Sequence, residues 1–251
     1  MNDVLAVLET YYDTAPRAAA TAEELGPFTV FMRDHADGWP YYARPRLGLV
    51  DPVSREDVDA VRARQREVGA PEALEWVHET TPTLLDAARA SGLHVAENPL
   101  LVLAEPVAAP PTDAEVRVLA ADDVVAAVVS AVHAGFSGSD EVEPHPGTRQ
   151  VALMRRGLLS LVGAYDDRGA VLGGGSHSPR GETTELTGIA VLPRARRRGV
   201  GAAVTAALVA DARERGVTTV FLSAQDDAVA RVYDRVGFVR VGTACVAGTE
   251  A

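Results

Sequence analysis

The residues best suited to chemistry form a basic, glycine-rich loop at positions 196–201, RRRGVG. An apolar stretch precedes the loop, and apolar residues recur behind it with the period of a helix. The first turn of a helix leaves backbone N–H groups without internal partners and carries partial positive charge, so it attracts anions. Glycines let an anion approach those groups, and arginines donate paired hydrogen bonds to phosphate oxygens. The residues predicted to bind a diphosphate are Arg196, Arg197, Arg198, Gly199, Val200 and Gly201.

The same loop has a second interpretation, as an arginine-rich turn in solvent or a patch that binds nucleic acid. The chain contains 24 basic and 35 acidic residues, and its formal net charge is -11 at pH 7. An acidic protein repels the phosphate backbone of nucleic acids, and no nucleic-acid-binding module is recognisable. The composition therefore disfavours a nucleic-acid partner and favours a cationic or neutral one.

The strand, the basic loop and the helix together resemble the GNAT superfamily of acetyl-CoA-dependent N-acetyltransferases, whose signature Q/R-x-x-G-x-G/A lies in this same setting. The resemblance covers residues 115–246 well. It implies acetyl-CoA as co-substrate, with the pyrophosphate held by backbone amides of residues 197–201. It also implies that the strand before the loop pairs with the pantetheine arm through Ile189, Ala190 and Val191.

Tyr233 lies in the pattern A-x-x-Y-x-x-x-G-F, which begins at Ala230. This pattern resembles the one that carries the superfamily tyrosine beside the CoA sulfur, and Ala230 belongs to the cofactor-contacting part of it. A tyrosine with an ordinary pKa near 10 is protonated at neutral pH and suits proton donation to a thiolate. The alternative is a tyrosine that packs in the core. We therefore expect Tyr233 to be the catalytic acid.

Glu185 is the candidate base, because some protein-acetylating members of the superfamily place a glutamate fourteen residues before the first loop glycine. A carboxylate partly buried in a sheet would have a raised pKa suited to accepting a proton. Glu182 is the nearby alternative, and a solvated glutamate at a strand end is the other interpretation of Glu185. The backbone N–H groups of residues 189–191 are expected to meet the acetyl carbonyl oxygen as it gains charge.

Asp226 departs from the family pattern, since many relatives have asparagine there, in contact with the pantetheine region. Asp226 or Asp227 could instead cap the following helix. His177, at the end of a predicted strand, has two interpretations, a group facing the acceptor or a structural histidine. The six histidines lack metal-ligand spacing, so no metal site is expected. The lone cysteine, Cys245, is expected to be buried and inert.

The elements that position these residues follow from periodicity and turn residues. Residues 105–113, EPVAAPPTD, predict a boundary between a degenerate GNAT-like domain at 1–110 and a catalytic domain at 111–251. After a strand at 115–119, a helix opened by Asp122 or Asp123 is expected. The later elements are predicted to be a helix near 150–156, strands at 158–165, 171–177 and 185–192, a helix from 200 to Gly216, a strand at 218–223, a helix ending at Gly237, and a strand at 238–246.

The first half repeats part of this plan. Residues 75–92 and 220–237 share the order strand, polar turn, helix and glycine, and the preceding tetrapeptides are REVG and RERG. The first copy has no glycine loop, and Ala88 replaces the tyrosine. The predicted fold class is therefore α+β (α/β), a tandem GNAT fold with a degenerate first copy. Each copy is expected to have a mixed, mostly antiparallel central sheet flanked by helices.

The acceptor is the least constrained part of the prediction. An acidic loop around Asp140, Glu141 and Glu143 either lines a cleft for a cationic amine or is simply solvated. The first half either closes one side of the acceptor site or mediates homodimerisation.

The primary hypothesis is an enzyme that transfers an acetyl group to a primary amine of a small molecule or peptide by direct attack. The alternative is a non-catalytic acetyl-CoA-binding sensor or scaffold, and a third hypothesis is a larger acyl donor. No apolar run reaches the length of a membrane span, and the first residues lack the basic region of a secretory signal. These features, with the unpaired cysteine, favour a cytoplasmic protein without a membrane partner.

Overall fold

The computed structural model describes residues 2–34, 41–105, 108 and 111–249, which form two compact units. Unit 1 contains Met1–Leu101, Ser223–Asp227 and Arg240–Ala251, and unit 2 contains Val102–Leu222 and Ala228–Val239. The division is not sequential, because the end of the chain returns to unit 1. The boundary segment predicted at 105–113 lies partly outside the described residues, so the division at 110/111 stays a prediction.

Unit 1 combines helices with six of the described strands. Its elements are α1 (Asn2–Thr14), the 3-10 helix η1 (Pro16–Ala18), β1 (Ala20–Leu25), β2 (Phe28–Arg33), β3 (Ala43–Pro45), α2 (Arg55–Glu67), β4 (Leu74–Val77), α3 (Thr83–Ala90), most of β5 (His94–Leu103) and most of β11 (Phe238–Gly248). Its strands lie in the order β1-β2-β3-β4-β11-β5. The β3–β4 pair is parallel, and the pairs β1–β2, β2–β3 and β4–β11 are antiparallel.

Local sequence explains the position of α2 in unit 1. Ser54 caps the helix, since its hydroxyl accepts from the Asp57 N–H while the Asp57 carboxylate accepts from the Ser54 N–H. Val58 and Val61, three residues apart, are buried in the core of unit 1. Cys245 belongs to the same core, as predicted, and burial raises the pKa of its thiol to about 12. Such a thiol is protonated and unreactive at neutral pH.

Unit 2 contains the segment predicted to do chemistry. Its elements are β6 (Glu115–Val118), α4 (Val125–Phe136), α5 (Thr148–Arg155), β7 (Ser160–Tyr165), β8 (Val171–Arg180), β9 (Thr183–Val191), the 3-10 helix η2 (Pro193–Ala195), α6 (Val200–Glu214), β10 (Thr219–Ser223) and α7 (Asp227–Asp234). Its strands lie in the order β10-β9-β8-β7-β6. The predicted antiparallel meander from β6 to β9 is confirmed, and β9 pairs with β10 in parallel.

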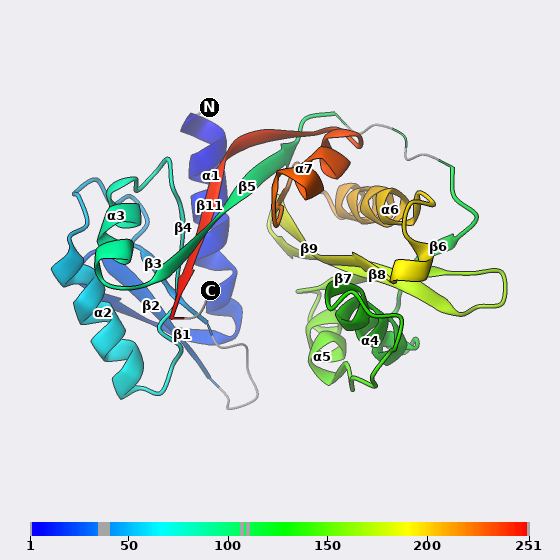
Figure 1. Ribbon diagram of the computed structural model, residues 1–251, viewed down its shortest axis with the longest axis horizontal. Coiled ribbons are helices and arrows are strands. Elements are labelled where there is room, and N and C mark those ends of the chain that lie inside the picture. Colours follow the sequence, from blue (N-terminus) through cyan, green and yellow to red (C-terminus); the bar gives the residue numbers. More distant parts are fainter. Residues whose placement is uncertain (1, 35–40, 106–107, 109–110, 250–251) are drawn as a thin grey trace. The chain divides into compact units, whose positions relative to one another are not determined.

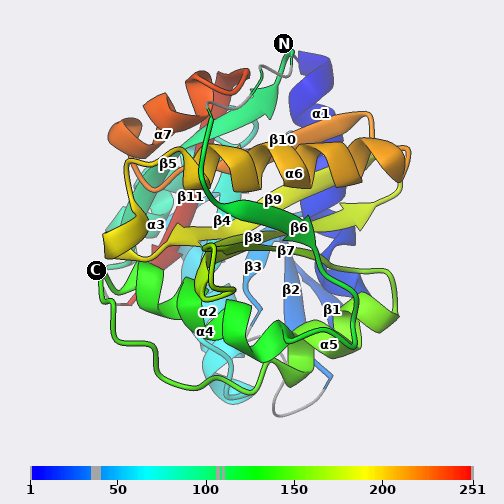
Figure 2. The same cartoon turned by 90° about the vertical axis from the view of Figure 1, so that its right-hand side faces the viewer.

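Helices cover both faces of the unit 2 sheet. Figures 1 and 2 show α4 and α5 on one face and α6 on the other. Every residue of β7 is buried as a result. On α6, Val200, Val204 and Leu208 are buried at the spacing that the sequence predicted, and the helix ends before Gly216, which has φ 82°.

One predicted helix start was wrong. The helix at 125–136 is not opened by Asp122 or Asp123, because Val124 occupies the N-cap position and no side chain caps it. The Asp123 carboxylate instead accepts a hydrogen bond from the Ala120 N–H at 2.8 Å, within the preceding turn. An aspartate close to a helix start can accept a hydrogen bond from the backbone of the helix or from that of the preceding turn. Here Asp123 bonds to the turn.

The internal repeat is confirmed at the level of secondary structure. β4, α3 and Gly92 repeat β10, α7 and Gly237, and both glycines have positive φ, 84° and 98°. The preceding helices α2 and α6 each end before a glycine with positive φ, Gly69 and Gly216. The parallel pair β3–β4 of unit 1 matches the parallel pair β9–β10 of unit 2. The chain therefore builds the same strand, helix and strand arrangement twice.

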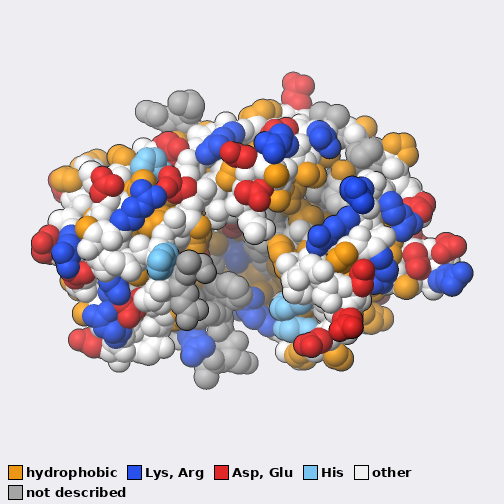
Figure 3. Space-filling model, in the orientation of Figure 1, with side chains coloured by type: hydrophobic (Ala, Val, Ile, Leu, Met, Phe, Trp, Pro, Cys, Tyr) orange, Lys and Arg blue, Asp and Glu red, His pale blue; other side chains and the backbone are white. Residues whose placement is uncertain are grey.

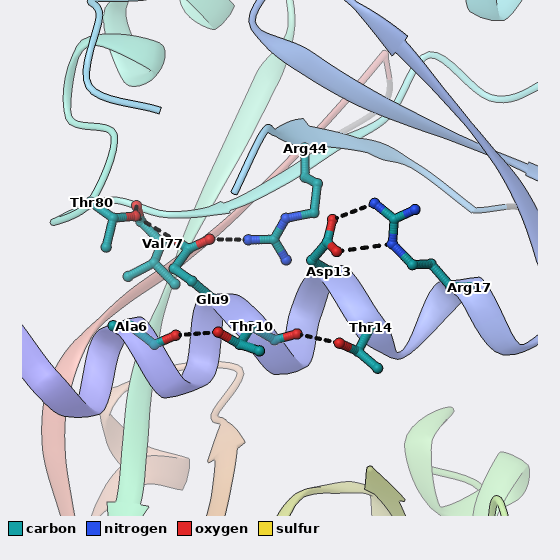
Figure 4. A network of polar contacts seen from close by, with 9 residues as sticks. All are labelled: Ala6, Glu9, Thr10, Asp13, Thr14, Arg17, Arg44, Val77 and Thr80. Atoms are coloured by element: carbon teal, nitrogen blue, oxygen red, sulfur yellow. Dashed lines mark hydrogen bonds and ion pairs between the residues drawn. The ribbon is translucent and has the colours of Figure 1, made fainter. Parts of the chain in front are cut away.

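Unit 1 has no glycine loop, and it buries a charged side chain, that of Arg44. The Arg44 guanidinium on β3 is only 1% exposed and pairs with the Glu9 carboxylate on α1 (Figure 4). The Thr80 hydroxyl donates to the same carboxylate at 2.7 Å. Burial raises the pKa of the neighbouring Glu75 to about 7, although the charge of Arg44 opposes this shift. The interior of unit 1 therefore contains a buried arginine whose charge is compensated by the Glu9 carboxylate.

We predict that Glu9→Gln destabilises the protein strongly, because it removes the carboxylate that pairs with the buried Arg44 guanidinium. The expected loss is about 3–5 kcal/mol in the free energy of unfolding. The matched control is Glu97→Gln, which removes the exposed pair with Arg89 and should cost less than about 1 kcal/mol. Urea denaturation measures both, and equal losses would contradict the role assigned to Glu9.

Candidate functional site

The strand β9 carries an irregularity that separates two of its residues from the regular ladder. In the register with β8, Gly174 faces Ala190 and Ser176 faces Thr187. One residue of β8 therefore lies opposite two residues of β9, Gly188 and Ile189, which defines a β-bulge. Gly188 has φ 62°, a backbone conformation that glycine adopts without strain. The bulge includes Ile189, the first of the three residues whose backbone groups are predicted to serve the acyl donor.

The last part of β9 has a free edge. β10 pairs with β9 from Thr183 to Glu185, whereas β8 pairs with β9 as far as Val191. In the described part of the chain, no strand continues the ladder on the β10 side of residues 186–191. Backbone groups along such an edge are available to an extended ligand that adds itself to the sheet.

The glycine loop leads directly from this edge into α6. After η2, Arg197 has φ 61°, and Gly199 occupies the N-cap position with φ 78°. The Ala203 N–H bonds to the Gly199 carbonyl at 3.0 Å, which leaves the N–H groups of residues 200–202 ahead of the first helical bond. Gly199 has no side chain to cap them, and the first turn contains no acidic residue. The helix start therefore has the geometry of an anion site.

The three loop arginines have different surroundings. Arg196 donates from Nε to the Val191 carbonyl at 3.1 Å and from Nη2 to the Gly135 carbonyl at 2.7 Å. Arg198 pairs with the Asp113 carboxylate, and its hydrogen bond, together with its charge, lowers the pKa of that carboxyl. Arg197 is exposed and has no partner among the residues that the structure describes. Figure 3 shows basic side chains gathered over the turn that precedes α6.

Tyr233 lies on α7, on the same side of the unit 2 sheet as α6 (Figures 1 and 2). Its ring packs edge-on against Phe238 at 5.9 Å between centroids, three residues after the buried Ala230. Its hydroxyl bonds to no described residue. Burial raises the pKa of Tyr233 to about 12, so the phenol keeps its proton throughout the neutral range.

The candidate carboxylates lie in different places. Glu185 is half-buried on β9, opposite Ser178 on β8 and Phe221 on β10, at the last paired position between β9 and β10. Glu182 is exposed, and its backbone carbonyl accepts from Thr218 and Thr219. Asp226 is exposed and belongs to unit 1, unlike the other candidate residues. Glu185 is thus the carboxylate at the point where the strands separate.

His177 is a structural residue. Its ring is fully buried, with Nδ1 at 3.0 Å from the Thr184 hydroxyl and Nε2 at 2.7 Å from the Asp211 carboxylate. Arg215 donates to the same carboxylate at 2.7 Å. Burial lowers the pKa of His177 and outweighs the opposing effect of Asp211, so the imidazole is neutral. Of its two interpretations, the structural one is correct, and the network joins β8, β9 and α6.

The acidic loop is attached to the turn before the glycine loop. The Asp140 carboxylate accepts from the Arg194 backbone N–H at 3.1 Å and from its guanidinium at 3.4 Å. Glu141 and Glu143 are exposed. His133 and His145 stack with ring centroids 4.6 Å apart. Across the described chain, no three metal-ligating side chains gather into a cluster.

Comparisons with known proteins agree with this geometry. Residues 127–238 match the model of the acetyltransferase (GNAT) family. The resemblance predicted from the sequence is therefore confirmed for this part of the chain. No curated protein matches the chain. None of the described helices has both the length and the apolar composition needed to span a bilayer.

Solved structures extend the likeness of fold to the first half. A GCN5-related N-acetyltransferase from Kribbella flavida is 22% identical and has a TM-score of 0.75, with 99% of this chain and 96% of that chain covered. A similar protein from Sphaerobacter thermophilus is 17% identical, with coverage of 90% and 81% and a TM-score of 0.61. A tandem GNAT protein from the clavulanic acid biosynthesis pathway is 18% identical, with coverage of 89% and 79% and a TM-score of 0.55. The predicted tandem fold class is confirmed.

Sequence reasoning missed the bulge and its free edge. The available signal was Gly188 inside an otherwise apolar strand, since an isolated strand glycine often marks a bulge. Sequence reasoning also assigned the same role to all three loop arginines. Their different partners in the folded structure distinguish them. The Gly135 carbonyl beside Arg196 and the Asp113 carboxylate beside Arg198 both come from segments distant in sequence.

We predict that acid destabilises the protein partly through His177. Because its folded pKa lies below the ordinary value near 6.5, the unfolded state binds the proton more readily. This contribution to stability is complete above about pH 6.5 and is lost as the pH falls toward the lowered pKa. His177→Gln should give a flatter dependence of urea midpoint on pH between about 7.5 and 5.5. The control His133→Gln, at an exposed site, should keep the wild-type slope, and a wild-type slope in His177→Gln would refute the prediction.

Proposed function

We propose that the protein is an acetyl-CoA-dependent N-acetyltransferase that acts on a primary amine of a small molecule or peptide. The free edge of β9 beside an uncapped helix start is the observation that carries the proposal. The match of residues 127–238 to the GNAT family model supports the acyl-transfer chemistry. In this proposal residues 111–251 form the catalytic domain, and residues 1–110 form a degenerate copy.

The residues fit acetyl-CoA. A pyrophosphate suits the N–H groups at the start of α6, where Gly199 and Gly201 leave the backbone accessible. Pantetheine is an extended amide chain, which suits the free backbone edge at Ile189, Ala190 and Val191. Acetyl-CoA would supply the activated thioester, and Ala230 and Asp226 are the remaining proposed contacts. Arg197 is the loop arginine whose guanidinium is available to phosphate.

The proposed chemistry is direct transfer. The amine nitrogen forms a bond to the acetyl carbonyl carbon, and the bond from that carbon to sulfur breaks with its electron pair leaving on sulfur. Tyr233 holds the proton that the departing sulfur accepts, and its raised pKa keeps that proton in place until the thiolate develops. Glu185 takes the proton from the amine. N–H groups of residues 189–191 stabilise the charge that develops on the carbonyl oxygen.

The acceptor class follows from charge. The net charge of -11 and the exposed carboxylates of Glu141 and Glu143 favour a cationic amine over an anionic one. The acidic loop joins the turn before the cofactor loop through Asp140, so in this proposal the loop lines the acceptor side. Homodimerisation through the first half remains the second role proposed for that half.

The proposal is tested by release of free CoA thiol from acetyl-CoA in the presence of a panel of amines, polyamines and peptides. Mass spectrometry of the acetylated product identifies the acceptor and the size of the acyl group. Thermal stabilisation by acetyl-CoA without turnover across the panel would instead support a sensor or scaffold. No stabilisation and no turnover would refute both.

We predict that Tyr233→Phe lowers kcat by about 10²-fold or more and changes the Kd of CoA little, since only the proton donor is lost. Because the pKa of Tyr233 is about 12, its ionisation should cause no fall in wild-type activity below about pH 10. Activity against pH and calorimetric CoA binding measure the two effects. Wild-type turnover in Tyr233→Phe would show that another group is the acid.

We predict different results for small and large substitutions in the glycine loop. A Cβ added at Gly201 would meet Val191 Cγ2 at 3.7 Å, an ordinary contact, so Gly201→Ala should keep CoA binding. Gly201→Glu should abolish CoA binding because it fills and negatively charges the anion site. Gly199→Ala should cost about 1 kcal/mol of stability, because alanine is strained at φ 78°. Intact CoA binding in Gly201→Glu would contradict the phosphate assignment.

A further inference from the structure

The peptide between Ala190 and Val191 is enclosed by two glycines from different elements. A Cβ added at Gly135, near the end of α4, would lie 3.0 Å from Ala190 Cβ and 3.2 Å from Val191 N. A Cβ added at Gly173, on β8, would lie only 2.3 Å from the Ala190 carbonyl oxygen. The backbone at the end of β9 therefore touches its neighbours where no side chain fits.

Arg196 holds the next peptide of the same strand end, between Val191 and Leu192. Its Nε donates to the Val191 carbonyl at 3.1 Å, and its Nη2 donates to the Gly135 carbonyl at 2.7 Å. The Gly135 carbonyl lies in the last turn of α4, where the helix dipole favours a cation. It also accepts from the Gly138 N–H at 3.2 Å, so the guanidinium uses its second lone pair. One planar group thus joins the end of β9 to the end of α4.

The same turn has a second attachment to the segment after α4. Arg194 binds Asp140 through its backbone N–H and, at 3.4 Å, through its guanidinium. Both side chains are nearly half exposed, at 45% and 44%, so this ion pair contributes little by itself. The Arg196 bonds go to backbone carbonyls, so they connect the backbone of β9 directly to the backbone of α4.

We propose that Arg196 is a positioning residue, which holds the backbone of β9 at Val191 in place for the acetyl group rather than binding the cofactor phosphate with its side chain. The inference rests on the proposed acetyl transfer. It divides the work of the loop, because the guanidinium of Arg197 is available to phosphate while that of Arg196 is engaged with two carbonyls. The fork of an arginine reaches both carbonyls at once, and a single ammonium reaches one.

Loss of the Arg196 fork frees the end of β9 on one of its three enclosed sides. The N–H groups of residues 190–191 then sample positions that do not match the acetyl carbonyl oxygen. A displacement of about 1 Å in such a group can lower turnover about 10²-fold. The phosphate site itself, made by backbone at the start of α6, remains.

The test compares Arg196→Gln and Arg196→Lys with two controls in the full chain. Arg197→Gln removes the arginine proposed to meet phosphate, and Arg168→Gln removes an exposed arginine of the β7–β8 turn. Hydrogen exchange of peptides covering residues 187–196 is measured without any ligand. Calorimetry with CoA at low and high salt reports the phosphate contact, since an exposed ionic contact weakens with salt. Turnover with acetyl-CoA and an acceptor amine completes the set.

We expect Arg196→Gln to speed exchange in residues 187–196 and to lower kcat about 10-fold to 10²-fold. Its CoA affinity should keep the wild-type salt dependence, whereas Arg197→Gln should weaken CoA binding and reduce that dependence. Arg196→Lys should recover part of kcat, and Arg168→Gln should match the wild type in every measurement.

Three results would overturn the proposal. Exchange at the wild-type rate in Arg196→Gln would show that the side chain does not hold the strand. Faster exchange with wild-type kcat would show that the contact has no bearing on the reaction. A CoA salt dependence reduced as far as in Arg197→Gln would make Arg196 a phosphate ligand. If no amine is acetylated, the proposed function fails by its own test, and exchange with CoA calorimetry still decides whether Arg196 clamps the strand or binds phosphate.

Discussion

The candidate site depends on one constraint, the early separation of β9 from its parallel neighbour. Pairing with β10 stops at Glu185, while pairing with β8 continues to Val191 past a bulge at Gly188 and Ile189. Backbone N–H and C=O groups need partners, so a strand edge left open inside a domain is suited to receive one from a ligand. The start of α6 presents further unpaired N–H groups a few residues later, and the two features together suit an extended chain that ends in phosphate.

The rest of unit 2 keeps that open edge rigid. The buried network of His177, Thr184 and Asp211 ties β8, β9 and α6 together with hydrogen bonds in a low-dielectric interior. Gly135 and Gly173 let α4 and β8 approach the end of β9 within contact distance of its backbone. A site that binds through backbone groups has no side chains to adjust, so its precision comes from the packing of the strand itself.

A comparison of the two halves of the chain shows which structural features the first half keeps although it lacks the candidate functional residues. Both have a parallel strand pair, a helix between the strands and a glycine with positive φ at the helix end. Unit 1 has no glycine loop, has Ala88 where unit 2 has Tyr233, and buries Arg44 against Glu9. Apolar positions set the packing, and packing survives the loss of polar groups, which explains why a degenerate copy keeps its fold.

The sequence by itself determined the family that the second half resembles, the repeat, and most strands and helices, because periodicity and glycine stops act over a few residues. It also placed the glycine loop at a helix start and Cys245 in the core. Only tertiary structure decided that His177 is structural, that Arg196 bonds to carbonyls of Val191 and Gly135, and that Asp123 serves a turn. A polar side chain offers several hydrogen bonds, and its possible partners include both nearby residues and segments distant in sequence, so the choice among them is made by the packed fold.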